Sequence, residues 1–153
     1  MKKIFISLLA GLLLISLSGC AGTKKTVCSV SDNKSFTNSI EITSKNGKMI
    51  SMKNTETYNI EAYWGVGPEQ AELLKEEAEK GLADFNALKG AKATVVLSKA
   101  KDEIAIVFTI NFKELDYAVY EQSVYNPIES FKPDNLSLTE YTDLVKSWGF
   151  TCK

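Results

Sequence analysis

The side chains of this chain that could do covalent chemistry are three cysteines, Cys20, Cys28 and Cys152. Histidine is missing, and arginine is missing too, because every basic residue is a lysine. These absences exclude a Ser-His-Asp triad, a Cys-His pair, a histidine-ligated metal and an arginine clamp on a phosphate. We therefore expect a protein that is not an enzyme and that holds no metal ion.

The residues before Cys20 indicate that its thiol carries a lipid. Lysines at positions 2 and 3 precede a nearly all-apolar run over residues 4–17. That run is shorter than the about 20 residues of a membrane-spanning helix, and it has the layout of a secretory signal peptide. Residues 17–20, Leu-Ser-Gly-Cys, resemble the bacterial lipobox, which implies diacylglyceryl transfer to the Cys20 thiol and cleavage just before it. The alternative is an ordinary signal peptide followed by a coincidental cysteine.

The lipobox divides the chain into three expected parts. Residues 1–19 are expected to be a lipoprotein signal peptide. Residues 20–35 are rich in Gly, Ser, Thr and Lys, and are expected to form the lipidated N-terminus and a flexible tether. Residues 36–153 are expected to form a single α+β domain, because a chain of 153 residues suffices for one globular domain and not for two.

The anchor also predicts where the protein is found. Two acyl chains bind firmly to a bilayer, because each buried CH₂ contributes about 0.8 kcal/mol. We expect the extracytoplasmic face of a membrane, either the outer face of the plasma membrane or, in a Gram-negative host, the periplasm. Ala21 after the cysteine is compatible with sorting to the outer membrane in such a host. The acyl lipid on Cys20 is the one non-protein group expected.

The charge of the mature chain bears on its partners. Removal of the signal peptide leaves 16 lysines against 19 acidic residues, a net charge of −3. No basic patch is visible in the sequence, so nucleic acid is not an expected partner. The expected partners are the membrane, through the anchor, and an unidentified protein or other component of the envelope. The protein is expected to be a monomer.

Cys28 and Cys152 remain once Cys20 is lipidated. Export places both outside the cytosol, where disulfides persist. A bridge between them would join the two ends of the domain, and such a long loop contributes about 4–5 kcal/mol in the chain-entropy model. The alternatives are two free thiols or a redox pair. The chain has neither a CxxC spacing nor a histidine to activate a thiolate, so we favour a structural disulfide.

Alternating apolar residues predict a first hairpin. A half-buried strand begins at Phe36, and Asn46-Gly47 is a strong turn signal. The chain then returns as a strand over residues 50–64. Asn54 and Glu56 interrupt the apolar face of that second strand, which predicts a bulge or a break near Asn54.

The rest of the chain predicts two helices and a second hairpin. An amphipathic helix is expected over residues 68–90, followed by strands over 93–97 and 104–112. Residues 115–131 are expected to be a loop with one helical turn. A capping-box pattern opens a final helix over residues 137–149. The order ββαββα indicates an α+β fold, with an antiparallel four-stranded sheet and two helices packed on one face.

The chain resembles the YehR-like family of small bacterial lipoproteins over nearly its full length. The resemblance rests on the lipobox, the hairpin at Asn46-Gly47, the Glu/Ala/Leu/Lys helix after Pro68, the alternating strand that ends at Phe112 and the closing segment Tyr141–Phe150. It implies an α+β fold and an envelope lipoprotein. It supplies no catalytic residue and no established activity, and the pairing of the cysteines does not follow from it.

Tyrosines predict a binding surface. Amphipathic rings on loops are typical of binding surfaces, and the candidate residues are Tyr63, Tyr117, Tyr120 and Tyr125. The alternative is that these rings cover the edge of the sheet or pack in the core.

Together these features favour a non-catalytic binding or interaction module at the cell envelope. One alternative is an accessory subunit or a small hydrolase-like enzyme that uses carboxylates, and another is a structural envelope lipoprotein. Glu72, Glu76 and Glu79 share one face of the predicted helix. Lysines interleave with them, which favours a solvated surface over a catalytic cluster.

Overall fold

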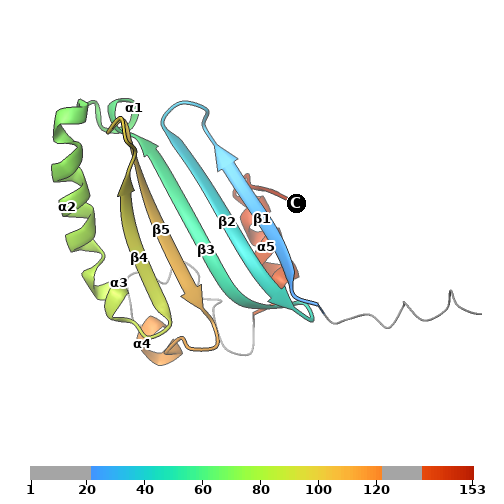
Figure 1. The fold of residues 1–153 in the computed structure, drawn as a ribbon. Coiled ribbons are helices and arrows are strands. Elements are labelled where there is room, and N and C mark those ends of the chain that lie inside the picture. Colours follow the sequence, from blue (N-terminus) through green and yellow to red (C-terminus); the bar gives the residue numbers. More distant parts are fainter. Residues whose placement is uncertain (1–21, 122–135) are drawn as a thin grey trace, which may run out of the picture.

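The computed structural model describes residues 22–121 and 136–153, and a six-stranded sheet is its centre (Figure 1). Each strand is antiparallel to its neighbours, in the order β4-β5-β3-β2-β1-β6. The expected signal peptide, Cys20 and Tyr125 lie outside the described residues. The strands are β1 (Lys24–Ser31), β2 (Phe36–Lys45), β3 (Lys48–Asn59), β4 (Ala91–Leu97), β5 (Glu103–Asn111) and β6 (Thr151–Cys152).

Short helices connect and cover these strands. None of the helices in residues 22–121 and 136–153 is long and apolar enough to cross a membrane. In Figure 1, α2 runs beside β4, α5 lies behind β1 and β2, and α1 and α4 lie at opposite ends of the sheet. The helices are α1 (Ile60–Trp64), the 3₁₀ turn η1 (Pro68–Gln70), α2 (Ala71–Gly81), α3 (Ala83–Ala87), α4 (Tyr117–Glu121) and α5 (Leu138–Ser147).

The expected four-stranded sheet with two helices is therefore wrong. The four predicted strands correspond to β2 to β5, and the sheet gains β1 on one side of β2 and β6 beyond it. Residues 24–31 belong to the sheet, paired with β2 from Lys24–Ser44 to Ser31–Thr37, so the expected tether over 20–35 is wrong for them. Their Lys, Ser and Thr residues suit solvent, and their place is set by pairing with a strand that follows. β6 spans only two residues, too few to show any periodicity.

Two further elements differ from prediction for local reasons. The expected strand over 50–64 ends at Asn59, whose side chain accepts a hydrogen bond from the Ala62 N–H at 2.9 Å and so caps α1. Gly65 ends α1 in the left-handed conformation, with φ of 69°. The expected helix over 68–90 is divided at Leu82, whose backbone (φ −95°, ψ 2°) departs from helical geometry.

The irregularity predicted near Asn54 lies elsewhere. The register of β2 and β3 shifts between Thr43 and Ser44, beside the turn formed by Asn46 (φ 54°) and Gly47 (φ 76°). Positive φ at both turn residues is the geometry that the Asn-Gly sequence favours. Between Ser51 and Asn59, β3 pairs with β5 without a break. Asn54 and Glu56 therefore stay on the same face as their apolar neighbours.

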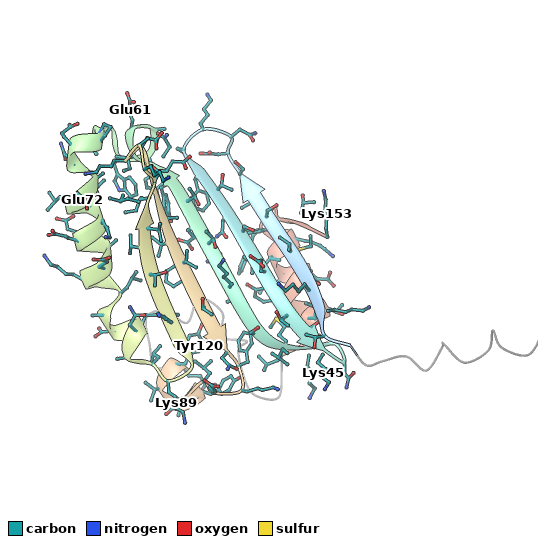
Figure 2. All side chains as sticks on the ribbon, in the orientation of Figure 1. Lys45, Glu61, Glu72, Lys89, Tyr120 and Lys153 are labelled. Atoms are coloured by element: carbon teal, nitrogen blue, oxygen red, sulfur yellow. A yellow bond between two sulfur atoms is a disulfide. The ribbon has the colours of Figure 1, made fainter. Side chains whose placement is uncertain are left out.

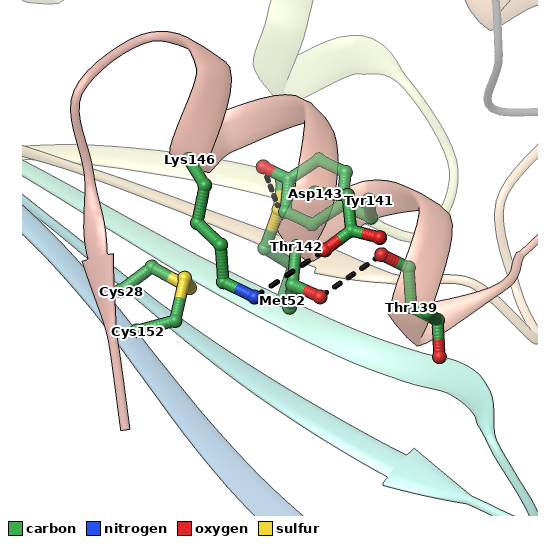
Figure 3. Close-up of a disulfide and its surroundings, with 8 residues drawn as sticks. All are labelled: Cys28, Met52, Thr139, Tyr141, Thr142, Asp143, Lys146 and Cys152. Atoms are coloured by element: carbon green, nitrogen blue, oxygen red, sulfur yellow. Dashed lines mark hydrogen bonds and ion pairs between the residues drawn. A yellow bond between two sulfur atoms is a disulfide. The ribbon is translucent and has the colours of Figure 1, made fainter.

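The helices pack on one face of the sheet, which we call the covered face. The Phe85 ring of α3 meets the Phe108 ring of β5 at 5.3 Å and nearly at right angles. The Tyr141 hydroxyl of α5 donates to the Met52 sulfur of β3 at 3.3 Å (Figure 3). Met52 pairs with Ile110, which lies two residues from Phe108 on β5. Residues two apart on a strand point to the same face, so both contacts lie on one face of the sheet.

Helix α5 is held at both ends. The Ser137 hydroxyl accepts from the Glu140 N–H at 3.3 Å, which confirms the predicted N-cap. Next to this cap, the Leu138 N–H donates to the Gly47 carbonyl at 2.9 Å and the Met49 N–H donates to the Leu136 carbonyl at 2.8 Å. The start of α5 is thus tied to the β2–β3 hairpin.

The disulfide ties the other end of α5. Cys28 and Cys152 are bonded, as predicted, and their Cα atoms face each other across β1 and β6 at 3.9 Å (Figure 3). Val27 and Lys153 exchange two backbone hydrogen bonds of 3.0 and 2.9 Å beside the bridge. Cys28 is fully buried, and 124 positions separate the two cysteines. The bridge therefore fixes both ends of the domain in the same sheet.

Replacing both Cys28 and Cys152 by serine should lower the free energy of unfolding by up to about 5 kcal/mol, because the unfolded chain regains the entropy of a very long loop. Urea unfolding of the oxidised protein measures this change. A Cys20→Ser variant is the matched control and should keep the parent's stability. Equal stability of the parent and the double variant would contradict a structural role for the bridge.

Candidate binding site on the covered face

Polar residues interrupt the covered face at the centre of the sheet. Glu56 on β3 pairs directly with Asn38 on β2, and Asn54 lies one step along β3 on the same face. Apolar residues of β5, Ile106 and Phe108, pair with Glu56 and Asn54 on the other side. All five side chains are half-buried, whereas residues of the same face nearer α5, such as those at positions 42 and 52, are buried. The helices thus leave this part of the covered face partly open.

The Glu56 carboxylate is held by two hydrogen bonds. Asn54 Nδ2 donates to Oε1 at 3.0 Å, and the Tyr58 hydroxyl donates to Oε2 at 2.8 Å. In the part of the chain that the structure describes, Glu56 forms no ion pair. On β3 itself, the lysine Lys53 pairs at 3.9 Å with Glu41, on the opposite face. The site therefore carries a fixed negative charge that no described lysine neutralises.

Two amide oxygens beside this carboxylate lack hydrogen-bond donors. Oδ1 of Asn38 and Oδ1 of Asn54 are both buried and unpaired within the described residues. The orientation of the Asn54 amide is fixed, because turning it would bring Oδ1 against the Glu56 carboxylate. An unpaired buried acceptor costs about 1–3 kcal/mol. The site is thus rich in acceptors whose burial is unfavourable to the isolated fold.

Burial raises the pKa of the Tyr58 phenol well above its usual value, and the hydrogen bond to Glu56 and the charge of that carboxylate raise it further. Tyr58 therefore stays protonated and keeps donating to Glu56 at any physiological pH.

Four aromatic rings form a cluster centred on Tyr58, the tyrosine that donates to Glu56. The Tyr58 ring lies 5.0 Å from Phe36, 4.7 Å from Tyr63 and 5.4 Å from Trp64, measured between ring centroids. Tyr63 and Trp64 meet each other at 4.8 Å with an interplanar angle of 70°. The Tyr63 and Trp64 side chains come from α1 and stay 52% and 39% exposed, so they present surface to solvent beside Tyr58.

We call this arrangement the β2–β3 site. Its aromatic members sit at the α1 end of the sheet, and its polar members continue along β2 and β3. The site consists of Phe36, Asn38, Asn54, Glu56, Tyr58, Tyr63 and Trp64.

The tyrosine surface predicted from the sequence is wrong as a single surface. Tyr63 is exposed on α1, but Tyr120 is only 1% exposed, in the core, where burial raises its pKa to about 12. Tyr117 is half-buried, and its hydroxyl donates to the Phe112 carbonyl at 2.9 Å. Glu61 of α1 and Tyr120 of α4 lie at opposite ends of the sheet (Figure 2).

Sequence reasoning missed the polar half of the β2–β3 site. The signal was present, because Asn38, Asn54 and Glu56 occupy positions of apolar parity. On β3 the sequence pattern instead predicts a bulge or a break near Asn54. A polar residue on the apolar face of a strand indicates either a bulge or a site, and only the register with β5 decides between them.

The carboxylates of the predicted helix face are surface groups. Glu72 and Glu79 of α2 are exposed and pair with Lys101 at 3.0 Å and Lys75 at 3.7 Å. Across residues 22–121 and 136–153, no group of three or more acidic or cysteine residues is arranged to hold a metal ion.

Asp32 shapes the turn between β1 and β2. It accepts hydrogen bonds from the Ser35 hydroxyl and from the N–H groups of Lys34, Phe36 and Ser35. The Ser35 hydroxyl, followed by these backbone donors, holds the pKa of Asp32 well below its usual value. This carboxylate is exposed and serves the turn.

A hollow of about 320 Å³ lies between α2, α3 and β4. The Asn86 amide oxygen at this place accepts the Ala93 N–H at 2.6 Å, so it already has a partner. The hollow is lined by Glu79, Leu82, Asn86, Ala93, Thr94 and Val95.

Comparisons with known proteins inform the fold. No protein-family model and no curated protein matches the chain. An NMR structure of a protein from Streptococcus pneumoniae is similar over 100% of this chain and 98% of that one, with a TM-score of 0.58 and 19% identity. The NMR structure of the E. coli YehR protein is similar over 86% of this chain and 91% of that one, with a TM-score of 0.67 and 14% identity. The chain thus has a YehR-like fold.

Tyr120→Ala should destabilise the protein by about 3–5 kcal/mol, the range for removing a large buried aromatic side chain. Tyr63→Ala is the matched control on the exposed α1 surface and should cost less than about 1 kcal/mol. Urea unfolding of the two variants tests this contrast. Similar losses in both would mean that the two rings are not divided between core and surface.

Proposed function

We propose that this chain is a lipid-anchored binding module of the cell envelope, and that it binds its ligand at the β2–β3 site. One observation carries the proposal. The Glu56 carboxylate, held by two hydrogen bonds and without an ion pair among the described residues, lies in a half-buried part of the covered face that also holds two unpaired amide oxygens. Its partner Tyr58 packs against the exposed rings of Tyr63 and Trp64.

The arrangement is unfavourable unless something binds to it. Apolar residues at Asn38, Asn54 and Glu56 would continue the surrounding core and would leave no unpaired acceptor. Groups that lower stability in this way concentrate at functional sites. Both oxygens of Glu56 are held in place, which suits the recognition of a ligand by a preorganised charge.

The anchor is supported by the sequence alone. The lysines and apolar run of residues 1–17, followed by Leu-Ser-Gly-Cys at 17–20, are the basis for lipidation at Cys20. The disulfide between Cys28 and Cys152 supports export, because disulfides persist outside the cytosol. The proposal therefore places the binding site in the extracytoplasmic space.

Thermal unfolding of the full chain in nonionic detergent, with a panel of sugars, amino acids, amines, peptidoglycan fragments, metal ions and lipids, tests the binding function. A ligand at a hundred times its Kd stabilises by about 2.7 kcal/mol, which raises the Tm by several degrees. Trp64→Ala should abolish the shift, whereas Trp148→Ala, which removes another exposed tryptophan (50% exposed), should preserve it. A panel without any shift, or a shift that survives Trp64→Ala, would contradict the proposal.

Cys20→Ser should release the protein from the membrane fraction of the expressing cells, because no acyl chain can then be attached. Quantifying the protein in membrane and soluble fractions measures the change. Cys28→Ser combined with Cys152→Ser is the control and should leave the protein with the membranes. Retention of Cys20→Ser in the membrane fraction would argue against a lipid anchor at this cysteine.

A further inference from the structure

We propose that the group recognised at the β2–β3 site is a protonated alkyl amine. This inference rests on the proposed binding function and adds to it the chemical class of the ligand. Three independent properties of the site lead to it: its charge, its hydrogen-bonding balance and its aromatic rings.

The charge of the site calls for a cation. The Glu56 side chain is half-buried at the centre of a sheet face, and no lysine of the described chain pairs with it. A partly desolvated carboxylate without a counter-charge is unfavourable, and a cationic ligand would remove that penalty. An anionic ligand would add to it.

The hydrogen-bonding balance calls for a donor. Each Glu56 oxygen accepts one hydrogen bond, Oε1 from one N–H of the Asn54 amide and Oε2 from the Tyr58 hydroxyl. Each of these carboxylate oxygens can accept a further hydrogen bond, so acceptor capacity remains on the half-buried Glu56 side chain. A primary ammonium group has three donors and no acceptor, so it matches this imbalance.

The exposed rings suit the same ligand. Cations bind over the faces of Trp and Tyr rings, within about 6 Å of the centroid. Tyr63 and Trp64 meet at 70°, and Tyr58, which links them to Glu56, lies within 5.4 Å of both. An alkylammonium group can therefore meet the carboxylate with its N–H groups while its methylene groups lie against the rings.

A neutral sugar fits the site less well. Sugars also lie on Trp and Tyr rings, but each hydroxyl needs acceptors and offers a lone pair that needs a donor. The Tyr58 proton is already committed to Glu56, and a neutral sugar has no charge to match that carboxylate. We therefore assign the amine as the ligand class and use a sugar as a comparison in the test.

The test uses the fluorescence of Trp64 in the full chain. Trp148→Phe removes the second of the two tryptophans, so that the tryptophan fluorescence comes from Trp64 alone. The probes are n-butylammonium, tetramethylammonium, n-butanol and glucose at constant ionic strength. We expect saturable binding of n-butylammonium, weaker binding of tetramethylammonium, which cannot donate N–H hydrogen bonds, and none of n-butanol or glucose.

Matched glutamate variants test the role of the charge. Glu56→Gln should weaken n-butylammonium binding at least about tenfold, the effect of losing a hydrogen bond to a charged group. Glu61→Gln removes an exposed carboxylate of α1 and should leave binding unchanged. Trp64 is the reporter, so Tyr63→Ala in the same background tests the ring contribution and should also weaken binding.

Two further probes distinguish the sources of the amine. Putrescine represents a free polyamine, and an acetylated, amidated tripeptide with a central lysine represents a protein side chain. Tighter binding of one of them identifies the source, and equal binding supports recognition of the ammonium group alone.

The outcomes separate the inference from the proposed function. If glucose or n-butanol binds as tightly as n-butylammonium, or if Glu56→Gln keeps full affinity, the amine assignment is overturned while binding at the site stands. If no amine binds but another panel compound gives a Trp64-dependent shift in Tm, the amine assignment fails and the binding function stands. If nothing binds at all, both the assignment and the binding function fail.

Discussion

The pairing of β3 with β2 on one side and β5 on the other is the constraint on which the rest of the structure depends. Successive residues of a strand point to opposite faces, so an unbroken register fixes which side chains share a face. It directs Met52 beneath α5, and the same alternation directs Asn54 and Glu56 onto the covered face. The core and the candidate site are thus two consequences of a single register.

The helical layer explains why one part of that face is core and another is a site. Helix α5 is tied to the hairpin at its start and to the disulfide after its end, which fixes it over Met52. On the other side, α3 holds Phe85 against Phe108. Between these contacts Asn38, Asn54 and Glu56 stay half-buried, while Ile40 among them is buried.

Locally encoded features were predictable from the sequence. The Asn46-Gly47 turn, the Ser137 cap and the alternation of β5 follow from short segments, and the structure contains each of them. The pairing of Cys28 with Cys152 was also predictable, because these two cysteines remain once Cys20 is assigned to lipidation. Strand β1 was not predictable, because its polar sequence becomes a strand only by pairing with β2. The polar half of the site was missed because bulge and continuous strand look alike until β5 fixes the register.

The place where β1 begins has a consequence for how the protein would stand on a bilayer. Only three residues separate Cys20 from Lys24, so an acylated cysteine would leave almost no slack before the sheet. Lys24 pairs with Ser44, whereas the aromatic rings lie near Phe36, eight positions and about 26 Å further along the sheet. The sheet would then act as a rigid spacer, with lipid at one end and the recognition surface held beyond the headgroups at the other.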